Sequence, residues 1–274
     1  MKVIGTFFEK IRQKLKKWLR TFVQWRLRNV SPHNFVLILS VLVGFTSGLV
    51  AVTIKNAVHV IQSGLLSEYI RPVQQYLYFV LPTIGILITY LIIHRVIKKP
   101  VGKGVPLILY SLSKENGFIK FYHTFASLIT APFTVAFGGS VGLEAPTVIT
   151  GSAIGSNLGR IFHLDYKMRT LLITCAAAGT VSSIFNAPIA GIVFAVEVIM
   201  IDLTTASLIP LLMASASASV TSRLFLGNDT LFHFSLTEVL QLSDVPFYIL
   251  LGITAGLVSV YFTITFLTIT KFGT

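Results

Sequence analysis

Charged side chains are scarce in this chain of 274 residues, where Asp, Glu, Lys and Arg together account for 12%. A soluble globular domain carries about a quarter of such residues. The deficit comes with 54% hydrophobic residues and a mean hydropathy of +0.80. This composition excludes an ordinary soluble domain and indicates that lipid surrounds much of the protein.

Cysteine is almost absent as well. Cys175 is the single cysteine, so no disulfide can form within the chain, and cysteine ligation of a metal is not expected. The six histidines are scattered, and no two of them have the i, i+4 spacing of a helical metal site. We therefore expect no metal, no cofactor and no catalytic residues, and we do not expect an enzyme.

Long segments without any charge are what the sequence does contain. Six of them have about 20 to 27 residues, enough to cross a hydrocarbon core of about 30 Å. They cover residues 29–54, 72–93, 121–143, 170–196, 203–222 and 245–270, and a shorter one covers residues 145–159. The pattern predicts an all-α integral membrane protein of about eight spanning or partly spanning helices.

Positive charge is concentrated before the first of these segments. Nine Lys and Arg lie within residues 1–30, interleaved with apolar residues at helical spacing. Such a block is also compatible with nucleic-acid binding, but a hydrophobic span follows at once, so the positive-inside rule explains it better. We predict an amphipathic basic helix over residues 1–30 on the cytoplasmic surface, and a transmembrane domain over residues 31–274. The connection after the second span is basic too, with Arg95, Lys98, Lys99 and Lys103.

Gly and Pro interrupt the apolar segments beyond residue 102. Transporters built from broken helices need such interruptions, because half-helices end inside the protein at membrane depth. Small residues also recur at four-residue spacing, which lets helices approach closely in lipid. They are Gly44 and Gly48, then Gly151, Gly155 and Gly159, then Gly252 and Gly256.

Two acidic residues, Glu144 and Glu197, are embedded in apolar sequence. A carboxylate there costs several kcal/mol unless it is paired, hydrated or protonated, so each is a functional candidate. For Glu197, capping of a neighbouring helix is an equal alternative. Glu144 lies between glycines and Pro146, which suits the first turn of a helix. Unpaired N–H groups at such a start attract anions, and a carboxylate at the same place is a tethered competitor.

A second segment has the same composition. Residues 102–106 read Gly-Lys-Gly-Val-Pro, with glycines before a proline at a predicted helix start. We take the residues of two segments as candidate anion-binding residues, and the backbone N–H groups near the two prolines as the ligands. One segment is Gly102, Lys103, Gly104, Val105 and Pro106; the other is Gly142, Leu143, Ala145 and Pro146.

These motifs resemble those of the CLC family of chloride channels and proton/chloride antiporters. Residues 102–106 resemble its first signature, Gly-Ser-Gly-Ile-Pro, and residues 142–146 its second, Gly-Arg/Lys-Glu-Gly-Pro. Residues 151–155, 185–191 and 193–197 are also similar to that family. The resemblance implies a broken-helix bundle of two inverted halves, of which this chain supplies the first and the start of the second. It further implies a homodimer in the cell membrane.

Residue by residue, the resemblance makes Glu144 the external gate. Lys103 stands where most members have a serine that touches the central anion, and it adds a positive charge. Val198 stands where coupled exchangers place an internal glutamate. We therefore predict chloride transport by channel-like passive conduction, with proton-coupled antiport as the first alternative. A secondary transporter of another solute is the second alternative.

The Gly-x-Ser-x-Gly pattern of serine hydrolases also occurs, at residues 138–142. That motif requires a strand, a sharp turn and a helix, whereas here its flanks are membrane-type sequence. An intramembrane protease would need a Ser–His pair, for which His123 is the nearby histidine, expected at the surface. We set this hypothesis below the other two.

Overall fold

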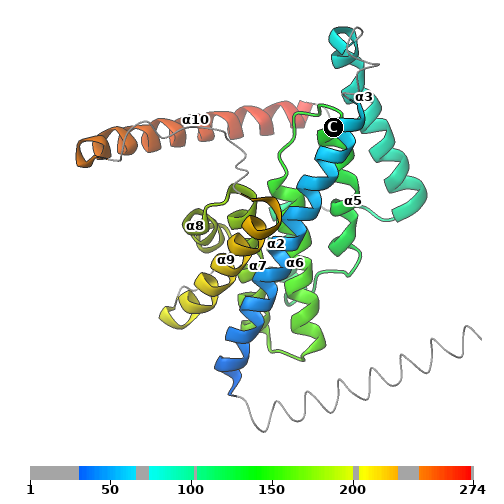
Figure 1. The fold of residues 1–274 in the computed structure, drawn as a ribbon. Helices are drawn as coiled ribbons and strands as arrows, with labels where there is room; N and C mark the ends of the chain where they lie inside the picture. Colours follow the sequence, from blue (N-terminus) through cyan, green and yellow to red (C-terminus); the bar gives the residue numbers. More distant parts are fainter. Residues whose placement is uncertain (1–30, 66–73, 102–103, 200–203, 228–240, 273–274) are drawn as a thin grey trace, which may run out of the picture. The chain divides into compact units, whose positions relative to one another are not determined.

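The computed structural model describes residues 31–65, 74–101, 104–199, 204–227 and 241–272. The chain divides into two compact units, residues 1–231 and 232–274. All the regular structure in the described ranges is helical, as predicted (Figure 1). The predicted surface helix over residues 1–30 lies outside the described residues.

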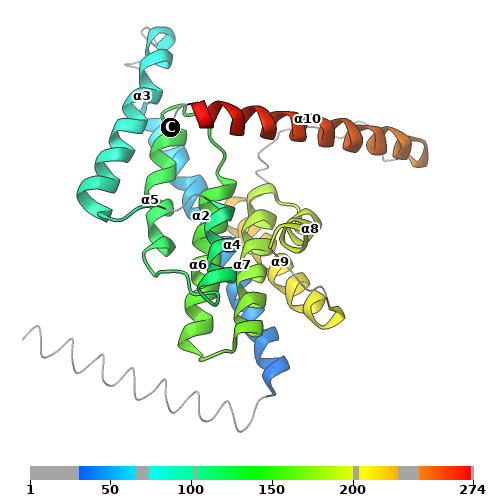
Figure 2. The same cartoon turned by 180° about the vertical axis from the view of Figure 1, so that it is seen from behind.

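Three long helices form the centre of the first unit: α2 (Pro32–Leu65), α7 (Tyr166–Phe185) and α9 (Thr205–Leu226). Each packs against the other two (Figures 1 and 2). Their close crossing depends on glycines at the contact points. A Cβ on Gly44 would overlap the carbonyl of Ala214, and one on Gly179 would lie 3.1 Å from Ser47 Cβ. Small residues thus bring α2, α7 and α9 into backbone contact, as expected for helices in lipid.

Helix α6 (Glu144–Ile161) packs along α7 in the same way. A Cβ on Gly151 would lie 2.5 Å from Thr180 Cγ2, and one on Gly155 would lie 2.7 Å from the carbonyl oxygen of Leu172. The predicted packing role of these glycines is therefore confirmed. In the second unit, α10 (Val245–Phe272) follows the short turn η3 (Leu242–Asp244). No atom of the described residues lies within 4 Å of a Cβ built on its Gly252 or Gly256, so close packing there stays a prediction.

The remaining helices of the first unit are shorter or less covered. They are α3 (Gln74–Ile92) with its continuation η2 (Ile93–Ile97), α4 (Val105–Lys114), α5 (His123–Ala136) and α8 (Pro188–Val198). Within the described ranges, five helical segments are long and apolar enough to cross a membrane: residues 34–65, 80–97, 166–185, 206–226 and 245–269. Helices α4, α5, α6 and α8 do not qualify, which fits the prediction of broken helices.

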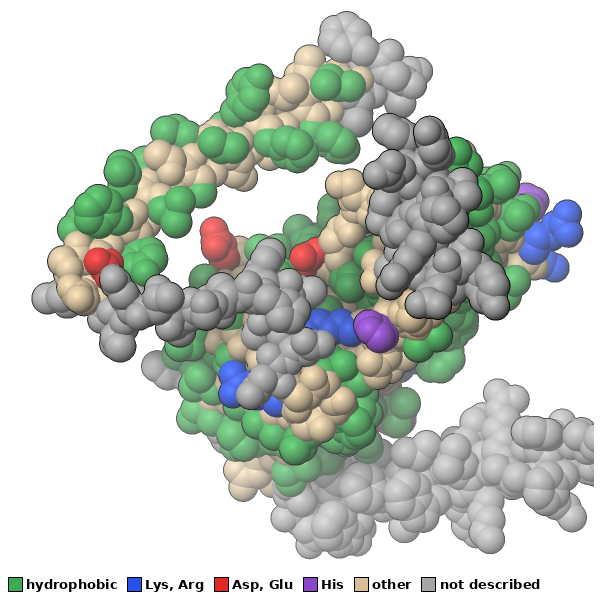
Figure 3. Space-filling view, turned by 45° about the horizontal axis from the view of Figure 1, so that its top comes forward, with side chains coloured by type: hydrophobic (Ala, Val, Ile, Leu, Met, Phe, Trp, Pro, Cys, Tyr) green, Lys and Arg blue, Asp and Glu red, His purple; other side chains and the backbone are tan. Residues whose placement is uncertain are grey.

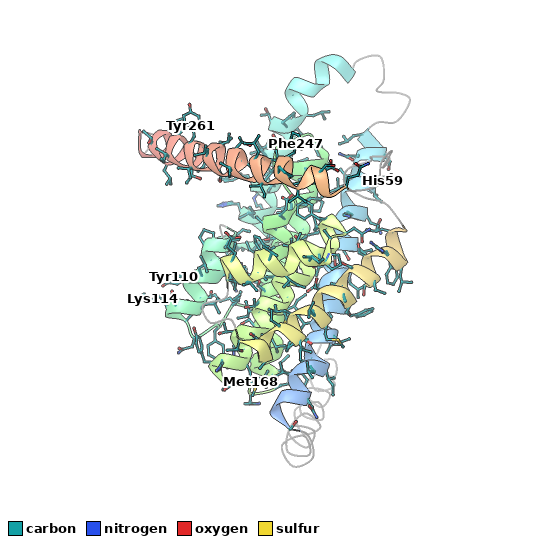
Figure 4. The ribbon with its side chains drawn as sticks, turned by 90° about the vertical axis from the view of Figure 1, so that its left-hand side faces the viewer. His59, Tyr110, Lys114, Met168, Phe247 and Tyr261 are labelled. Carbon is teal, nitrogen blue, oxygen red and sulfur yellow. The ribbon has the colours of Figure 1, made fainter. Side chains whose placement is uncertain are left out.

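The connection from α4 to α5 is anchored to the central helices by buried polar groups. Ser156 Oγ donates to the carbonyl of Gly117 (2.6 Å) and accepts from the amide of Ile119 (2.9 Å). Arg169 donates to the carbonyl of Asn116 (2.9 Å), and its guanidinium carbon lies 3.9 Å from the ring centre of Phe118. These contacts fix α4 relative to α6 and α7. Figure 4 shows Tyr110 and Lys114 pointing outward from α4.

Candidate anion site

Helix α4 begins at Val105, within the first glycine–proline segment of residues 102–106. Gly104 caps the helix with φ 70° and ψ −142°, and Val105 and Pro106 form its first turn. Only glycine adopts this backbone conformation readily. The carbonyl of Gly104 accepts from the amide of Leu107 (3.1 Å), which starts the helix. Gly102 and Lys103, the other two predicted ligands here, lie outside the described residues.

Helix α6 begins at Glu144, as the sequence predicted. Leu143 is its cap, and the carbonyl of Leu143 accepts from the amide and the hydroxyl of Thr147, at 3.1 and 2.8 Å. Within the described part of the chain, no acceptor is recorded for the amides of Gly142, Leu143, Glu144 and Ala145. The start of α6 therefore presents unpaired N–H groups and the positive end of the helix dipole.

One cavity joins the two helix starts. It has a volume of about 220 Å³, and its walls include Gly104 of α4 and Gly142, Ala145 and Pro146 of α6. A Cβ on Gly104 would lie 3.4 Å from Ala145 Cβ, so the two helix ends approach each other closely. Figure 2 shows α4 beside α6. The structure thus brings together residues that are about 40 positions apart in the sequence.

Glu144 itself does not line the cavity, but its carboxylate lies against Gly142, which does. The side chain is partly buried. It turns back over the preceding glycine, because a Cβ built on Gly142 would overlap Glu144 Oε2 and lie 3.2 Å from Oε1. Absence of a side chain at Gly142 therefore leaves room for the Glu144 carboxylate next to the unpaired amides.

Helix α5 contributes polar cavity residues that the sequence reasoning missed. Ser127, Thr130 and Thr134 line the cavity, and Ser127 and Thr130 are buried. Thr134 Oγ1 is 2.9 Å from Thr89 Oγ1 of α3, a hydrogen bond that holds this wall in place. The available signal was a row of hydroxyl residues spaced three and four apart in an otherwise apolar segment, which is one face of a helix.

Glu197, the other candidate carboxylate, is not part of this cavity. It is exposed near the end of α8, one residue before Val198. The next residue, Ile199, is buried in a hydrophobic cluster with Ile108 and Leu112 of α4. No interaction of the Glu197 side chain with another described residue is recorded.

The structure separates the residues of the protease hypothesis. Ser140 follows the end of α5, whereas His123 is the first residue of that helix, which implies a separation of about 20 Å along 14 residues. His123 is buried, with 3% of its surface exposed, so the expectation of a surface histidine was wrong. Its ring instead packs on Tyr122, with ring centres 4.1 Å apart. No group of three His, Cys, Asp or Glu that could hold a metal occurs in the described ranges.

Comparison with known proteins agrees with this geometry. The profile of the family described as "Voltage gated chloride channel" matches residues 84–274. An H(+)/Cl(-) exchange transporter, ClcA of Vibrio cholerae, is 27% identical over 254 residues, which are 87% of this chain and 53% of that protein. The chain thus spans about half the length of the curated relatives it matches.

Two solved structures have a similar fold. A CLC-type fluoride/proton antiporter superposes with a TM-score of 0.64 at 26% identity, over 82% of this chain and 55% of that one. A slow cyanobacterial Cl-/H+ antiporter superposes with a TM-score of 0.67 over 84% of this chain and 55% of that one. Its sequence identity is 22%, so this likeness concerns the fold alone. Since the family profile covers well over half of the residues and the helical fold agrees, the chain belongs to the voltage gated chloride channel family, the CLC proteins.

Proposed function

We propose that the starts of α4 and α6 form an anion-binding site, through which the protein carries chloride or a similar anion across the membrane. One observation carries the proposal: two helix N-termini open into one cavity, and amides at the start of α6 have no recorded partner among the described residues. Helix N-termini in a low-dielectric setting favour a negative ion through their N–H groups and dipoles.

The cavity has a suitable size and lining. Since a water molecule takes about 30 Å³, a volume of about 220 Å³ admits an anion together with several waters. The hydroxyl residues Ser127, Thr130 and Thr134 of α5 make a further part of the lining polar. Lys103, next to Gly104, supplies a positive charge that attracts anions or holds one more tightly than the serine of most family members.

Glu144 is the proposed gate. Its carboxylate carries the same charge as the transported ion and lies beside the same amides, so carboxylate and anion compete for one place. Protonation or displacement of Glu144 then opens the path. This proposal follows from electrostatics and requires neither a metal nor a catalytic group, in keeping with a family of transporters and channels rather than enzymes.

Proton-coupled antiport is the form of transport that the relatives support. Sequence reasoning favoured channel-like passive conduction, because Val198 replaces an internal glutamate. The relative from Vibrio cholerae and the two solved structures are, however, named as exchangers or antiporters. We therefore propose exchange of an anion against protons, with Glu144 as the proton-carrying group and Glu197 of α8 as a second candidate carboxylate.

The test is simultaneous recording of chloride efflux and pH from liposomes that contain the protein. We expect chloride efflux to drive proton movement in the opposite direction. In Glu144→Gln, chloride efflux should persist or increase while proton movement stops, because a neutral side chain neither competes with the anion nor carries a proton. Glu115→Gln is the matched control, since Glu115 lies outside the cavity, and both fluxes should be unchanged.

The same recording separates the alternatives. Chloride efflux without proton movement in the unmodified protein would favour passive conduction. Loss of chloride efflux in Glu144→Gln would contradict the gate. A cation transporter would use Glu144 as a ligand, so cation uptake that disappears in Glu144→Gln would support that class, although cation sites favour helix C-termini and carbonyls.

Membrane topology and assembly complete the proposal. We propose that the protein spans the cell membrane several times, as expected of a CLC protein. By the positive-inside rule its N-terminus is on the cytoplasmic side. Following the family resemblance, we propose a homodimer with one pathway in each subunit. Cross-linking in membranes, read as dimer against monomer, tests the assembly.

A further inference from the structure

The end of α3 differs from the other helix ends of the first unit. The last turn, η2 (Ile93–Ile97), is a π-turn, and Lys98 after it has the left-handed conformation with φ 53°. The amide of Lys98 donates to the carbonyl of Ile93 (2.8 Å), which closes this wide turn. Single π-turns inside helices are rare and occur frequently at functional sites.

Positive charge gathers on this turn, and no described acidic residue has a recorded ion pair with it. His94, Arg95, Lys98 and Lys99 are all exposed. Figure 3 shows basic side chains beside a histidine at the right-hand edge of the molecule, where α3 ends. Neither Arg95 nor Lys98 has an ion pair recorded with any acidic residue in the described part of the chain. A counter-charge from outside the protein would therefore be favourable.

The turn also borders a shallow, open hollow of about 390 Å³. Its walls are Tyr90, Ile93, His94, Lys98, Lys99 and Pro100. Tyr90 and His94 form one wall, with their rings stacked at 5.8 Å and an interplanar angle of 9°.

Two residues of the hollow, Lys99 and Pro100, are contacted by Tyr122, the cap residue of α5. Tyr122 donates its hydroxyl to the carbonyl of Pro100 (2.9 Å). The Nζ atom of Lys99 lies 5.1 Å from the centre of the Tyr122 ring, within the range of a cation–π contact. Tyr122 thus positions Lys99 and Pro100 at the edge of the hollow.

Apolar surface leads directly into this hollow. Leu87, Tyr90 and Leu91 are 56%, 59% and 44% exposed on α3. They precede His94 and Lys98 at spacings of three and four residues, so they lie on one helix face. A ligand that matches this face has apolar chains along α3 and an anionic group at its end, which describes a phospholipid and not free phosphate.

We propose that the hollow at the end of α3 binds the phosphate headgroup of an anionic phospholipid, whose acyl chains lie along the exposed face of α3. By the positive-inside rule this headgroup belongs to the cytoplasmic leaflet. Basic pockets between transmembrane helices on that side are suited to anionic headgroups. The proposal goes beyond anion transport, because none of the hollow's residues lines the cavity at Glu144.

The test is lipid retention measured by native mass spectrometry on the purified protein, with phosphatidylglycerol and phosphatidylcholine as probes. Each lysine near a membrane surface contributes about a fivefold preference for anionic lipid, so Lys98→Gln with Lys99→Gln should weaken phosphatidylglycerol binding by about 25-fold. Phosphatidylcholine retention should not change. Lys114→Gln with Lys167→Gln is the control, because it removes the same charge from two exposed lysines elsewhere.

A third variant separates a shaped site from diffuse attraction. Tyr122→Phe keeps every charge and the aromatic ring but loses the hydrogen bond to Pro100. We expect it to weaken phosphatidylglycerol binding several-fold. Three results would each overturn the proposal. They are equal losses of phosphatidylglycerol binding in the two lysine double variants, unchanged binding in Tyr122→Phe, and displacement of the lipid by millimolar inorganic phosphate. None of these results would bear on the gate at Glu144, whose variant is assayed by flux.

Discussion

The substitution Gly104→Ala tests most directly whether the start of α4 forms part of the anion site. Gly104 has φ 70° and ψ −142°, a region that alanine adopts only with strain of about 1 to 3 kcal/mol. The space beside it is not the difficulty, since a new Cβ would lie 3.4 Å from Ala145 Cβ, an ordinary contact. We expect the backbone to relieve the strain by rotating φ to a negative value. That rotation turns the first amides of α4 away from the cavity.

The chain supplies a matched control in Gly227, the cap at the end of α9. Its backbone has φ 68° and ψ −147°, almost the same conformation, and no described atom lies within 4 Å of its Cβ position. Gly227→Ala should therefore lower stability by a similar 1 to 3 kcal/mol, or less if the helix end adjusts. It lies at the end of a different helix, so it should leave anion binding unchanged.

The assay is thermal unfolding of the detergent-purified protein in chloride and in a large, non-transported anion such as gluconate. A ligand at a hundred times its Kd stabilises the folded state by about 2.7 kcal/mol, which raises Tm by about 5 to 10 °C. We expect this chloride-dependent rise in the unmodified protein and in Gly227→Ala, and a much smaller rise in Gly104→Ala. Equal chloride effects in both variants would refute the assignment of the α4 start to the anion site.

Two further predictions concern the packing that positions the site, and both are read from the free energy of unfolding in mixed micelles. Gly44→Ala should destabilise by about 1 to 3 kcal/mol, because its Cβ would overlap the backbone of Ala214 and overpacking against backbone cannot relax easily. Gly64→Ala, on the same helix in open space, should instead be neutral or stabilise by up to about 1 kcal/mol; equal effects would contradict the close crossing of α2 and α9. Ser156→Ala should cost about 1 to 3 kcal/mol, since it leaves a buried backbone amide and carbonyl of the α4–α5 connection without partners. Ser113→Ala, which removes an exposed hydroxyl from α4, should change stability by less than about 0.5 kcal/mol, and a comparable loss there would show that burial is not the cause.

Local properties of the chain were predictable from its sequence. Scarcity of charge predicted membrane helices, because lipid leaves the backbone no partner except itself. Glycines before Pro106 and Pro146 predicted helix starts, since glycine permits the unusual backbone and proline needs no hydrogen-bond acceptor in the first turn. The prediction that Glu144 stands at such a start was correct, and the small residues of α2 and α6 proved to be contact points.

Relations between distant segments required the tertiary structure. Sequence periodicity places a residue on one face of its own helix, but it does not reveal which helix that face meets. For this reason the meeting of Gly104 with Ala145, the hydroxyl wall from α5 and the burial of His123 emerged only from the fold. The basic hollow at the end of α3 has the same origin: its lysines are visible in the sequence, whereas the contacts of Tyr122 with Pro100 and Lys99 depend on how the α4–α5 connection packs.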